Sequence, residues 1–288
     1  MQHGRSLSVR TVTTNASILY LGLLEDGDIE LDSAALALSA LDHEGVDLAP
    51  YLDQLRTITH ALDIARRAQG DAVPATGAGQ GAVLAAVIGG KLGFAGDSES
   101  YDAPLNADMI RVLDRKRGLP VSLAILYVAA ARRLGWKADA LNTPSHVLVA
   151  IGPTASRAFI DPFHGGAPVS PARLTALFER ATGPGEWAAQ NKAEPMSNRM
   201  TLVRLLRNQA IRAEQEKDID RACTVYQRMT IVAPDHGHGW WHLARLQLIM
   251  GRIEEARTSL SAMLEVTRDP QWRGHITQTL IRLSASEG

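Results

Sequence analysis

A histidine and an aspartate stand at opposite ends of two short apolar runs near the middle of the chain. The first run, 146–151, opens with His146, and the second, 158–160, is followed by Asp161. If the two runs pair as strands, the imidazole and the carboxylate come together, as a general base and its orienting acid do in a nucleophile–His–acid triad. The same geometry also suits a hydrogen bond that only ties two strands together.

The element that would carry a nucleophile is a helix that begins at Pro120. Apolar side chains recur along it, and Gly135 stands where it would end, behind two arginines. Proline is tolerated at the first helical position because the first-turn N–H groups lack an intrahelical acceptor, and basic residues suit a helix C-terminus. We therefore expect a helix–strand–strand unit that brings the Pro120 end of the helix, His146 and Asp161 together.

This arrangement resembles the core of the transglutaminase-like superfamily, in which a Cys opens the helix, a His starts one strand and an Asp lies on the next. The helix pattern G-x-C…A…L-G of that superfamily aligns without gaps on Gly118-Leu119-Pro120…Ala124…Leu134-Gly135. His146 and Asp161 match the other two triad members, and the nucleophile position falls on Pro120. Since proline has no thiol, hydroxyl or N–H, the resemblance implies the fold and argues against the reaction.

More specific motifs resemble the SirB-one family of bacterial proteins from Leu31 onward. Its series is a GF-x-G loop, a Tyr, an Asn-led helix, R-x-G-x-P, P-x-H and IDPF-x-GG. The chain has these motifs in the same order, at Gly93–Gly96, Tyr101, Asn106, Arg117–Pro120, Pro144–His146 and Ile160–Gly166. Arg115 and Arg117 offer two registers for the arginine of the family. The resemblance implies a transglutaminase-like domain followed by tetratricopeptide-like helices.

Ser122 is the nearby hydroxyl that could replace the missing thiol. It lies two positions after Pro120, hence about 200° around the axis at roughly 3.6 residues per turn, and should point away from the nucleophile position. Its hydroxyl would then satisfy a free first-turn N–H group. A hydrolase or acyl transferase that uses Ser122, His146 and Asp161 stays open as the alternative function.

Further polar residues of these motifs are candidates for a binding cleft. The full set is Tyr101, Asn106, Arg117, Asn142, His146, Asp161 and His164. Tyr101 and Asn106 could brace a loop over the pocket, or Asn106 could only cap a helix. The basic run 115–117 could bind an anion together with the helix N-terminus, or form a solvated face with one arginine in an ion pair.

Metal and thiol chemistry have weaker support. His146, Asp161 and His164 lack a typical ligand spacing, so we expect no metal and no other cofactor. Three more histidines between 236 and 242 stand at a helix start beside two tryptophans, which suits surface and packing roles. Cys223 lies inside a repeat, where a small buried residue is expected rather than a nucleophile.

The last third of the chain repeats itself at a spacing of 34 residues. The pairs are Ala210 and Ala244, Ala222 and Ala256, Tyr226 and Leu260, and Met229 and Met263. Small residues that let two helices approach, alternating with large ones, are typical of tetratricopeptide repeats. We predict helical hairpins at 201–234 and 235–268, and a capping helix at 271–285. Two repeats are fewer than the roughly three needed for independent stability, so the tail should pack on the first domain.

The domain plan follows from these patterns. We predict a transglutaminase-like (papain-like) helical domain with a small antiparallel sheet at 1–182, a Gly/Pro/Asn-rich linker at 183–198 and an all-α tail at 199–288, hence an α+β fold. Near the N-terminus a helix capped by Asp32 or Ser33 precedes a second one, and 69–81 reads as a loop before a helix at 82–92. The apolar run 18–24 could be helix or strand.

Composition limits the possible functions. The net charge of −1 gives no overall attraction to nucleic acid or acidic lipid, and no apolar stretch is long enough to span a bilayer. One cysteine excludes an internal disulfide, and the start lacks the apolar region of a secretory signal, so we expect a cytoplasmic bacterial protein. The predicted function is a non-catalytic module that binds a protein or peptide partner, with the oligomeric state left open.

Overall fold

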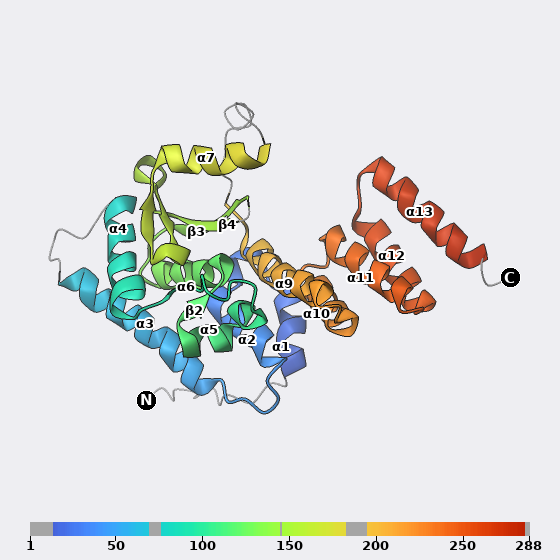
Figure 1. Ribbon diagram of the computed structural model, residues 1–288, viewed down its shortest axis with the longest axis horizontal. Helices are drawn as coiled ribbons and strands as arrows, with labels where there is room; N and C mark the ends of the chain where they lie inside the picture. Colours follow the sequence, from blue (N-terminus) through green and yellow to red (C-terminus); the bar gives the residue numbers. More distant parts are fainter. Residues whose placement is uncertain (1–13, 69–75, 145, 183–194, 286–288) are drawn as a thin grey trace, which may run out of the picture.

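The computed structural model describes residues 14–68, 76–144, 146–182 and 195–285. The N-terminal part surrounds one helix with further helices and a small sheet, and a tail of paired helices extends to one side (Figure 1). This arrangement confirms the predicted α+β class, a helical domain with a small antiparallel sheet followed by an all-α tail.

Helices make up most of the first part. They are α1 (Thr14–Leu23), α2 (Leu31–Ala40), α3 (Ala49–Arg67), α4 (Gly77–Leu84), which continues as a π-helix (Ala85–Lys91), α5 (Met109–Arg115), α6 (Pro120–Arg133) and α7 (Pro171–Thr182). As predicted, α6 begins at Pro120, and Gly135 follows its end with φ +76°. Every side chain from Pro120 to Ala131 is buried, so this helix must be covered on all sides.

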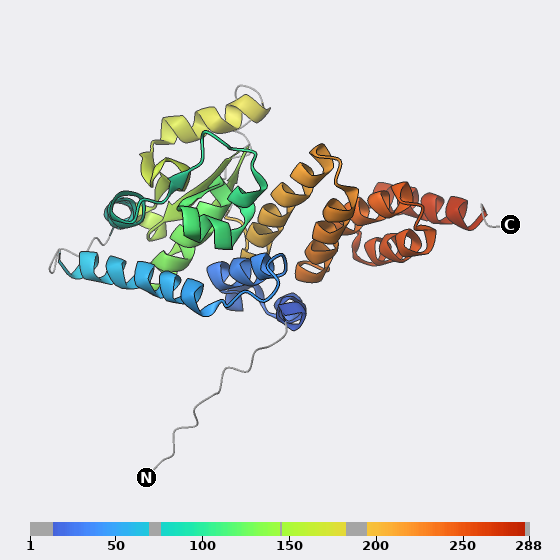
Figure 2. The same ribbon diagram turned by 60° about the horizontal axis from the view of Figure 1, so that its bottom comes forward.

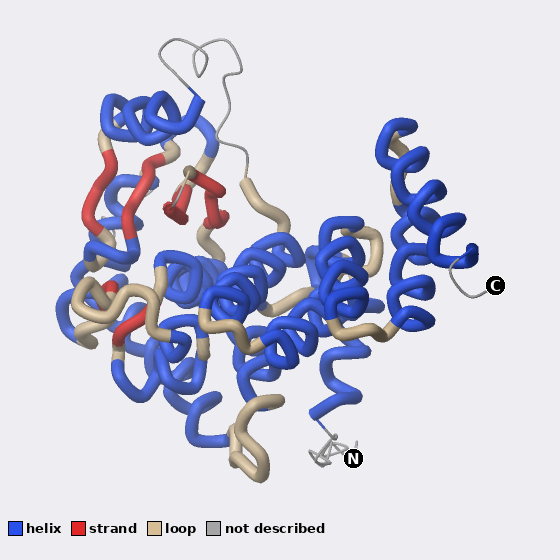
Figure 3. Tube along the Cα trace, turned by 45° about the vertical axis from the view of Figure 1, so that its right-hand side comes forward, coloured by secondary structure: helices blue, strands red, loops and turns tan. Residues whose placement is uncertain are grey.

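The sheet covers one side of α6. Its antiparallel strands follow the order β3 (Ala138–Thr143), β4 (His146–Ile151), β5 (Ala158–Asp161) and β6 (Ala167–Val169). Figures 1 and 3 show α7 on the opposite face of the sheet, where Leu174 packs against Leu141, Leu148 and Val169. The sequence predicted the pairing of β4 with β5 but not the flanking strands β3 and β6. A parallel pair, β1 (Ala95–Gly96) and β2 (Arg117–Gly118), lies apart from this sheet.

Two local expectations need correction, and the open choice between helix and strand for the run 18–24 is settled. Residues 18–23 belong to helix α1, and Leu24 follows it. The expected loop at 69–81 ends earlier: 69–75 lie outside the described residues, and α4 already begins at Gly77, capped by the Thr76 hydroxyl. A Cβ at Gly77 would lie 2.1 Å from the carbonyl oxygen of Ile151, so glycine here permits close packing of α4 on β4 rather than a loop.

The cap of α2 is the second correction. The helix begins at Leu31, and Glu30 occupies the capping position without a side-chain hydrogen bond. Asp32 instead accepts two hydrogen bonds of 2.6 Å from Arg133, near the end of α6, and is almost fully buried. The acidic residue that resembled a local cap therefore joins two helices that are distant in sequence.

The tail consists of α9 (Asn198–Gln215), α10 (Ile219–Val232), α11 (Gly237–Ile249), α12 (Ile253–Val266) and α13 (Pro270–Ala285). Both ends of α10 lie 34 residues before the ends of α12, and the turns before these helices place Lys217 and Gly251 at φ +63° and +73°. All eight residues of the 34-spaced pairs are buried. The predicted hairpins and the last helix are thus present, and Figure 2 shows them side by side.

The tail packs on the first part of the chain, as expected. One apolar core runs from Ile18 in α1 to Leu246 in α11 and includes α6 and the inner face of the sheet. Because this core is continuous, and because 183–194 lie outside the described residues, the division at a 183–198 linker stays a prediction. Within the part of the chain that the structure describes, no helix combines the length and apolar character needed to cross a bilayer.

Asp42, just after α2, forms ion pairs with two arginines of the tail. Arg228 donates hydrogen bonds of 2.8 and 2.7 Å to its carboxylate, and Arg221 donates another of 2.6 Å, both from α10. Burial opposes ionisation, but the hydrogen bonds and charges of the two arginines outweigh it and lower the pKa of Asp42 to about 2.

We predict that this carboxylate makes the folded protein sensitive to acid. A lowered pKa in the folded state gives stability that is complete above the ordinary Asp value of about 3.9 and disappears as the pH falls toward 2. Asp42→Asn should reduce stability at pH 7 and flatten its dependence between those pH values, measured by urea unfolding. Asp53→Asn is the control, because its pair with Arg56 is exposed and lies within α3. Equal effects of both variants would contradict the prediction.

Candidate functional site

The N-terminal end of α6 opens into a cavity of about 220 Å³. Leu119, the capping residue, has extended backbone and makes no side-chain cap, and Pro120 occupies the first helical turn. The wall includes Leu119, Pro120, Val121, His146, Val147 and Tyr101. Where the superfamily resemblance places a thiol, this cavity therefore presents a pyrrolidine ring, which carries no proton to remove and no nucleophilic atom.

His146 and Asp161 are hydrogen-bonded neighbours, as the sequence predicted. The pairing of Val149 with Ile160 aligns β4 and β5 so that the start of one strand meets the end of the other. His146 Nε2 lies 2.9 Å from Asp161 Oδ1, and the carboxylate is fully buried. The ionised carboxylate can only accept, so Nε2 is the donor of this hydrogen bond.

The Asp161 carboxylate is surrounded by donors. Besides His146, the backbone N–H of Phe163 donates to Oδ1 at 3.1 Å, and His164 Nδ1 and Arg173 approach Oδ2 at 2.8 and 3.4 Å. Burial alone would raise the pKa of Asp161, but the hydrogen bonds and charges of His146 and His164 outweigh it and lower this pKa. A buried carboxylate with this many partners remains an anion near neutral pH.

His146, Asp161 and His164 place one possible metal-ligand atom each within 4.8 Å of one another. Two imidazoles and a carboxylate are a donor set that transition metals accept. Here both ring nitrogens that face the carboxylate act as its hydrogen-bond donors, and Arg173 adds a positive charge beside it. The observed geometry is thus that of a hydrogen-bonded carboxylate, and the expected lack of a metal stays a prediction.

Phe163 packs among the aromatic rings of the site. Its ring meets Tyr101, His146 and His164 edge-on, with centroid distances of 5.7, 6.0 and 5.4 Å. A Cβ at Gly96 would lie 2.3 Å from this ring, so β1 can pass beside Phe163 only as glycine. The ring fixes the position of the His146 imidazole relative to the loop that carries Tyr101.

Asn106 braces that loop rather than capping a helix. Its side chain donates to the carbonyl oxygens of Ser100 and Tyr101 at 2.6 and 3.3 Å and accepts from Arg115 at 2.9 Å. The cap of α5 is Asp108, which accepts from two backbone N–H groups. Of the two alternatives for Asn106, the structure therefore shows the brace.

Ser122 is fully buried, and its hydroxyl donates to the carbonyl oxygen of Asn106 at 2.8 Å. It does not satisfy a first-turn N–H group, and it does not line the cavity that Pro120 and His146 share. Its proton is thus directed toward a backbone carbonyl rather than toward the imidazole.

The remaining candidates lie apart from this cavity. Arg117 donates to the carbonyl oxygens of Gly93 and Lys116, whereas Arg115 reaches the buried Asp97 at 2.7 Å. The basic run therefore holds loops together. Asn142 lies on β3 and lines a second cavity, and His164 is half-exposed beside Asp161.

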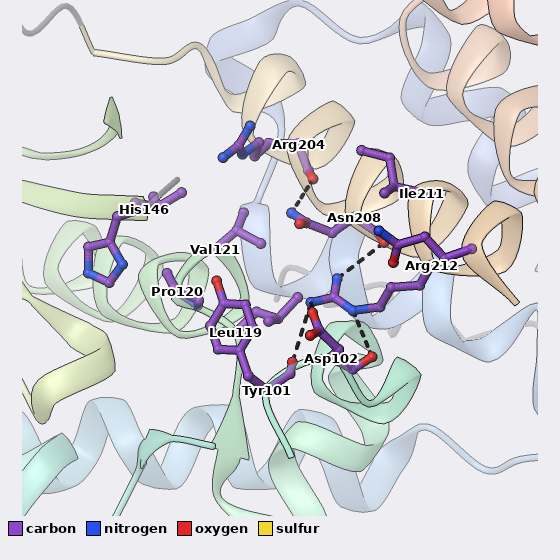
Figure 4. Close-up of a pocket in the computed structure, with 12 residues that line it drawn as sticks. Tyr101, Asp102, Leu119, Pro120, Val121, His146, Arg204, Asn208, Ile211 and Arg212 are labelled. Carbon is purple, nitrogen blue, oxygen red and sulfur yellow. Dashed lines mark hydrogen bonds and ion pairs between the residues drawn. The ribbon is translucent and has the colours of Figure 1, made fainter. Parts of the chain in front are cut away.

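Helix α9 of the tail forms the far wall of the first cavity, with Arg204, Asn208, Ile211, Arg212 and Gln215 (Figure 4). Arg212 is buried and donates to the carbonyl oxygens of Asp102 at 2.8 Å and Tyr101 at 3.3 Å. This contact holds the Tyr101 loop against the tail. The sequence motifs did not predict this wall of the cavity, because it forms only when a helix distant in sequence packs against the first part of the chain.

Burial raises the pKa of the Cys223 thiol, which lies in α10, and its side chain is almost fully buried. The expectation of a small buried residue is confirmed. Raising the thiol pKa lowers the thiolate fraction, so this residue is a poor nucleophile.

A family model described as "Transglutaminase-like superfamily" matches residues 50–207, which is more than half of the chain. The match includes α6, the sheet and the first part of α9, and it ends before all the cavity-lining residues of α9 except Arg204. The sequence resemblance to that superfamily is thus supported by an independent comparison.

Curated relatives extend this similarity. The UPF0162 protein of Xylella fastidiosa (strain 9a5c) is 30% identical over 179 residues, which cover 61% of this chain and 64% of that protein. The UPF0162 protein of Vibrio cholerae serotype O1 is 34% identical over 74 residues, 25% of this chain and 27% of that protein. The aligned part thus spans less than two thirds of each relative.

A mammalian protein shares a shorter segment. F-box only protein 21 of Mus musculus is 38% identical over 77 residues, which cover 27% of this chain and 12% of that protein. The shared segment is thus a small part of a much longer polypeptide.

We predict that His146 contributes more to stability than His164, although both bond to the same carboxylate. The His146 side chain is 17% exposed and that of His164 is 55% exposed, so only the first bond is well shielded from water. His146→Ala should lower the free energy of unfolding by about 1–3 kcal/mol. His164→Ala, the matched control, should cost less. Urea unfolding at pH 7 measures both, and a larger cost for His164→Ala would refute the ranking.

Proposed function

Because the chain belongs to the transglutaminase-like superfamily, we propose that it is a non-catalytic member whose cleft binds a protein or peptide partner. The observation that carries the proposal is Pro120 in the wall of the cavity that His146 also lines. Acyl transfer of the superfamily type requires a thiolate at the helix start, where the helix dipole and a neighbouring imidazole lower the thiol pKa. Proline supplies none of this.

The cavity suits an extended chain. It lies between the N-terminal end of α6 and helix α9, and its lining combines apolar side chains such as Val121 and Ile211 with the polar groups of Asn208 and His146. Its volume of about 220 Å³ is below that of a typical drug-sized pocket, so it fits one or two side chains of a longer ligand. The small shared segment in F-box only protein 21 supports a role as a module.

The proposal includes a finer family assignment, namely a SirB-one-type domain with a tetratricopeptide-like tail. It is supported by the motif series from Gly93 to Gly166 and by the 34-residue offset between α10 and α12. In tetratricopeptide arrays, paired helices present a concave surface to a partner. Here the first hairpin turns α9 toward the cleft, so tail and cleft would contact the same ligand.

A second candidate is a hydrolase or acyl transferase with Ser122 as nucleophile. It is favoured by the hydrogen-bonded His146–Asp161 pair, which has the geometry of a base and its orienting acid. It requires the Ser122 hydroxyl to leave the Asn106 carbonyl and to come within hydrogen-bond reach of the imidazole.

We predict no turnover in amine-incorporation and peptidase assays on the purified protein, because none of the described residues that line the cavity with His146 carries a thiol or an aliphatic hydroxyl. Ser122→Ala and His146→Ala proteins that remain folded should give the same background as the wild type. Turnover by the wild type that both substitutions abolish would overturn the proposal and support the second candidate.

A variant with a thiol at the start of α6 tests whether this position faces the cleft and His146. Pro120→Cys should give a cysteine that reacts with iodoacetamide near pH 7 faster than the buried Cys223, because the helix N-terminus and His146 favour the thiolate. Adding His146→Ala should slow this reaction. An unreactive Cys at 120 in a folded protein would show that the position does not face the cleft.

A further inference from the structure

A second cavity, of about 230 Å³, lies beside the first along helix α9. Arg204 lines both cavities, so the two are adjacent, and we refer to them together as the groove. The wall of the second cavity includes Asn142 from β3, Arg207 from α9, and methionines at 196, 200 and 229. The three histidines between 236 and 242 complete it, at the loop before α11 and its first turns.

The charge of this lining is one-sided. Two arginines and three histidines face the cavity, and no described aspartate or glutamate lines it. Glu214 interacts electrostatically with His242 but already has two bonding partners. Its carboxylate accepts a hydrogen bond from the Tyr226 hydroxyl at 2.7 Å and forms an ion pair with Arg245.

Arg204 and Arg207 differ from the other arginines of α9. Arg199 donates to the carbonyl oxygens of Leu21, Leu24 and Val232, and Arg212 is bonded to the Tyr101 loop. Neither guanidinium of Arg204 and Arg207 has a hydrogen bond or ion pair within the described ranges, and Figure 4 draws no interaction at that of Arg204. Among the described residues, these two neighbouring cations thus have no counter-ion, whereas the other two arginines of the helix are hydrogen-bonded.

Two buried polar atoms of the wall also lack partners. Arg204 Nε and His242 Nδ1 are both buried without a hydrogen bond. Buried polar atoms are nearly always paired, so such orphans point to a missing partner. Burial and, after it, the charge of Arg207 lower the pKa of Arg204, which shows that these cations repel each other.

We propose that the second cavity binds the carboxylate of an acidic residue in a peptide whose neighbouring residues occupy the first cavity. Arginine forks recognise carboxylates through paired, charge-assisted hydrogen bonds, and the flexible methionines accept the apolar residue that flanks the acid. Two free arginines neutralise one or two charges, which suits an acidic side chain and not the long phosphate backbone of a nucleic acid. The inference rests on the proposed function, because it names the chemistry of the same partner.

The inference can be tested by fluorescence anisotropy with two short fluorescein-labelled peptides. In the first, Glu alternates with Leu and Ala; in the second, every Glu is replaced by Gln. The wild type should bind the Glu peptide in a salt-sensitive way and the Gln peptide at least about tenfold more weakly. The Arg204→Gln/Arg207→Gln protein should lose the same preference. Arg282→Gln on the distant α13 is the charge-matched control for the single variant Arg207→Gln, since each removes one positive charge, and it should bind as the wild type does.

Arg207 is exposed, so Arg207→Gln alone serves as a variant whose folding is not at risk. It should weaken binding of the Glu peptide and leave the midpoint of urea unfolding unchanged. If the Glu and Gln peptides bind equally well, the proposed preference for an acidic residue is wrong, whereas the proposed peptide-binding function is not contradicted. Absence of saturable binding of the Glu peptide would overturn the inference, and turnover in the peptidase assay would overturn the proposed function instead.

Discussion

The structure depends on one constraint, the complete burial of helix α6. Every side chain from Pro120 to Ala131 is buried, with Ala129 the most exposed at 7%, so the helix has no face on which it can lie at the surface. The strands β3 and β4 cover one side, α2 and α3 cover others, and α9 of the tail closes the remainder. Because this last contact comes from the tail, the core around α6 is built from both parts of the chain.

Burial of α6 also accounts for the polar network at its start. The backbone carbonyl of Asn106 accepts from the N–H of Leu119 and from the hydroxyl of Ser122, two donors that would otherwise be unsatisfied in an apolar core. On the other side of the cavity, Asp161 can be buried as an anion only because four donors surround it. The hydrogen bonds that satisfy buried groups in this region therefore also set the geometry of the site.

Local sequence patterns predicted those parts of the site that come from helices and strands adjacent in sequence. The proline start of α6, and the meeting of His146 with Asp161, follow from helix and strand signals within one segment. The role of Asp32 was misread because a capping aspartate and one that binds a distant arginine look alike in sequence. Gly77 was assigned to a loop because glycine serves close packing as well as turns, and only the neighbouring strand distinguishes the two uses.

The sequence did not predict the α9 wall of the cavity, because α9 comes next to the cavity only through tertiary packing. Along α9, Arg199 and Arg212 bond to carbonyl oxygens of the first part, whereas Arg204, between them in sequence, lines both cavities and its buried Nε has no hydrogen-bond partner in the described part of the chain. The same helix thus provides both the contacts that dock the tail and the free cations. If the groove binds the proposed ligand, docking and recognition are linked: a change that loosens the tail would also remove one wall of the groove, and a ligand held across both walls would stabilise the docked arrangement by mass action.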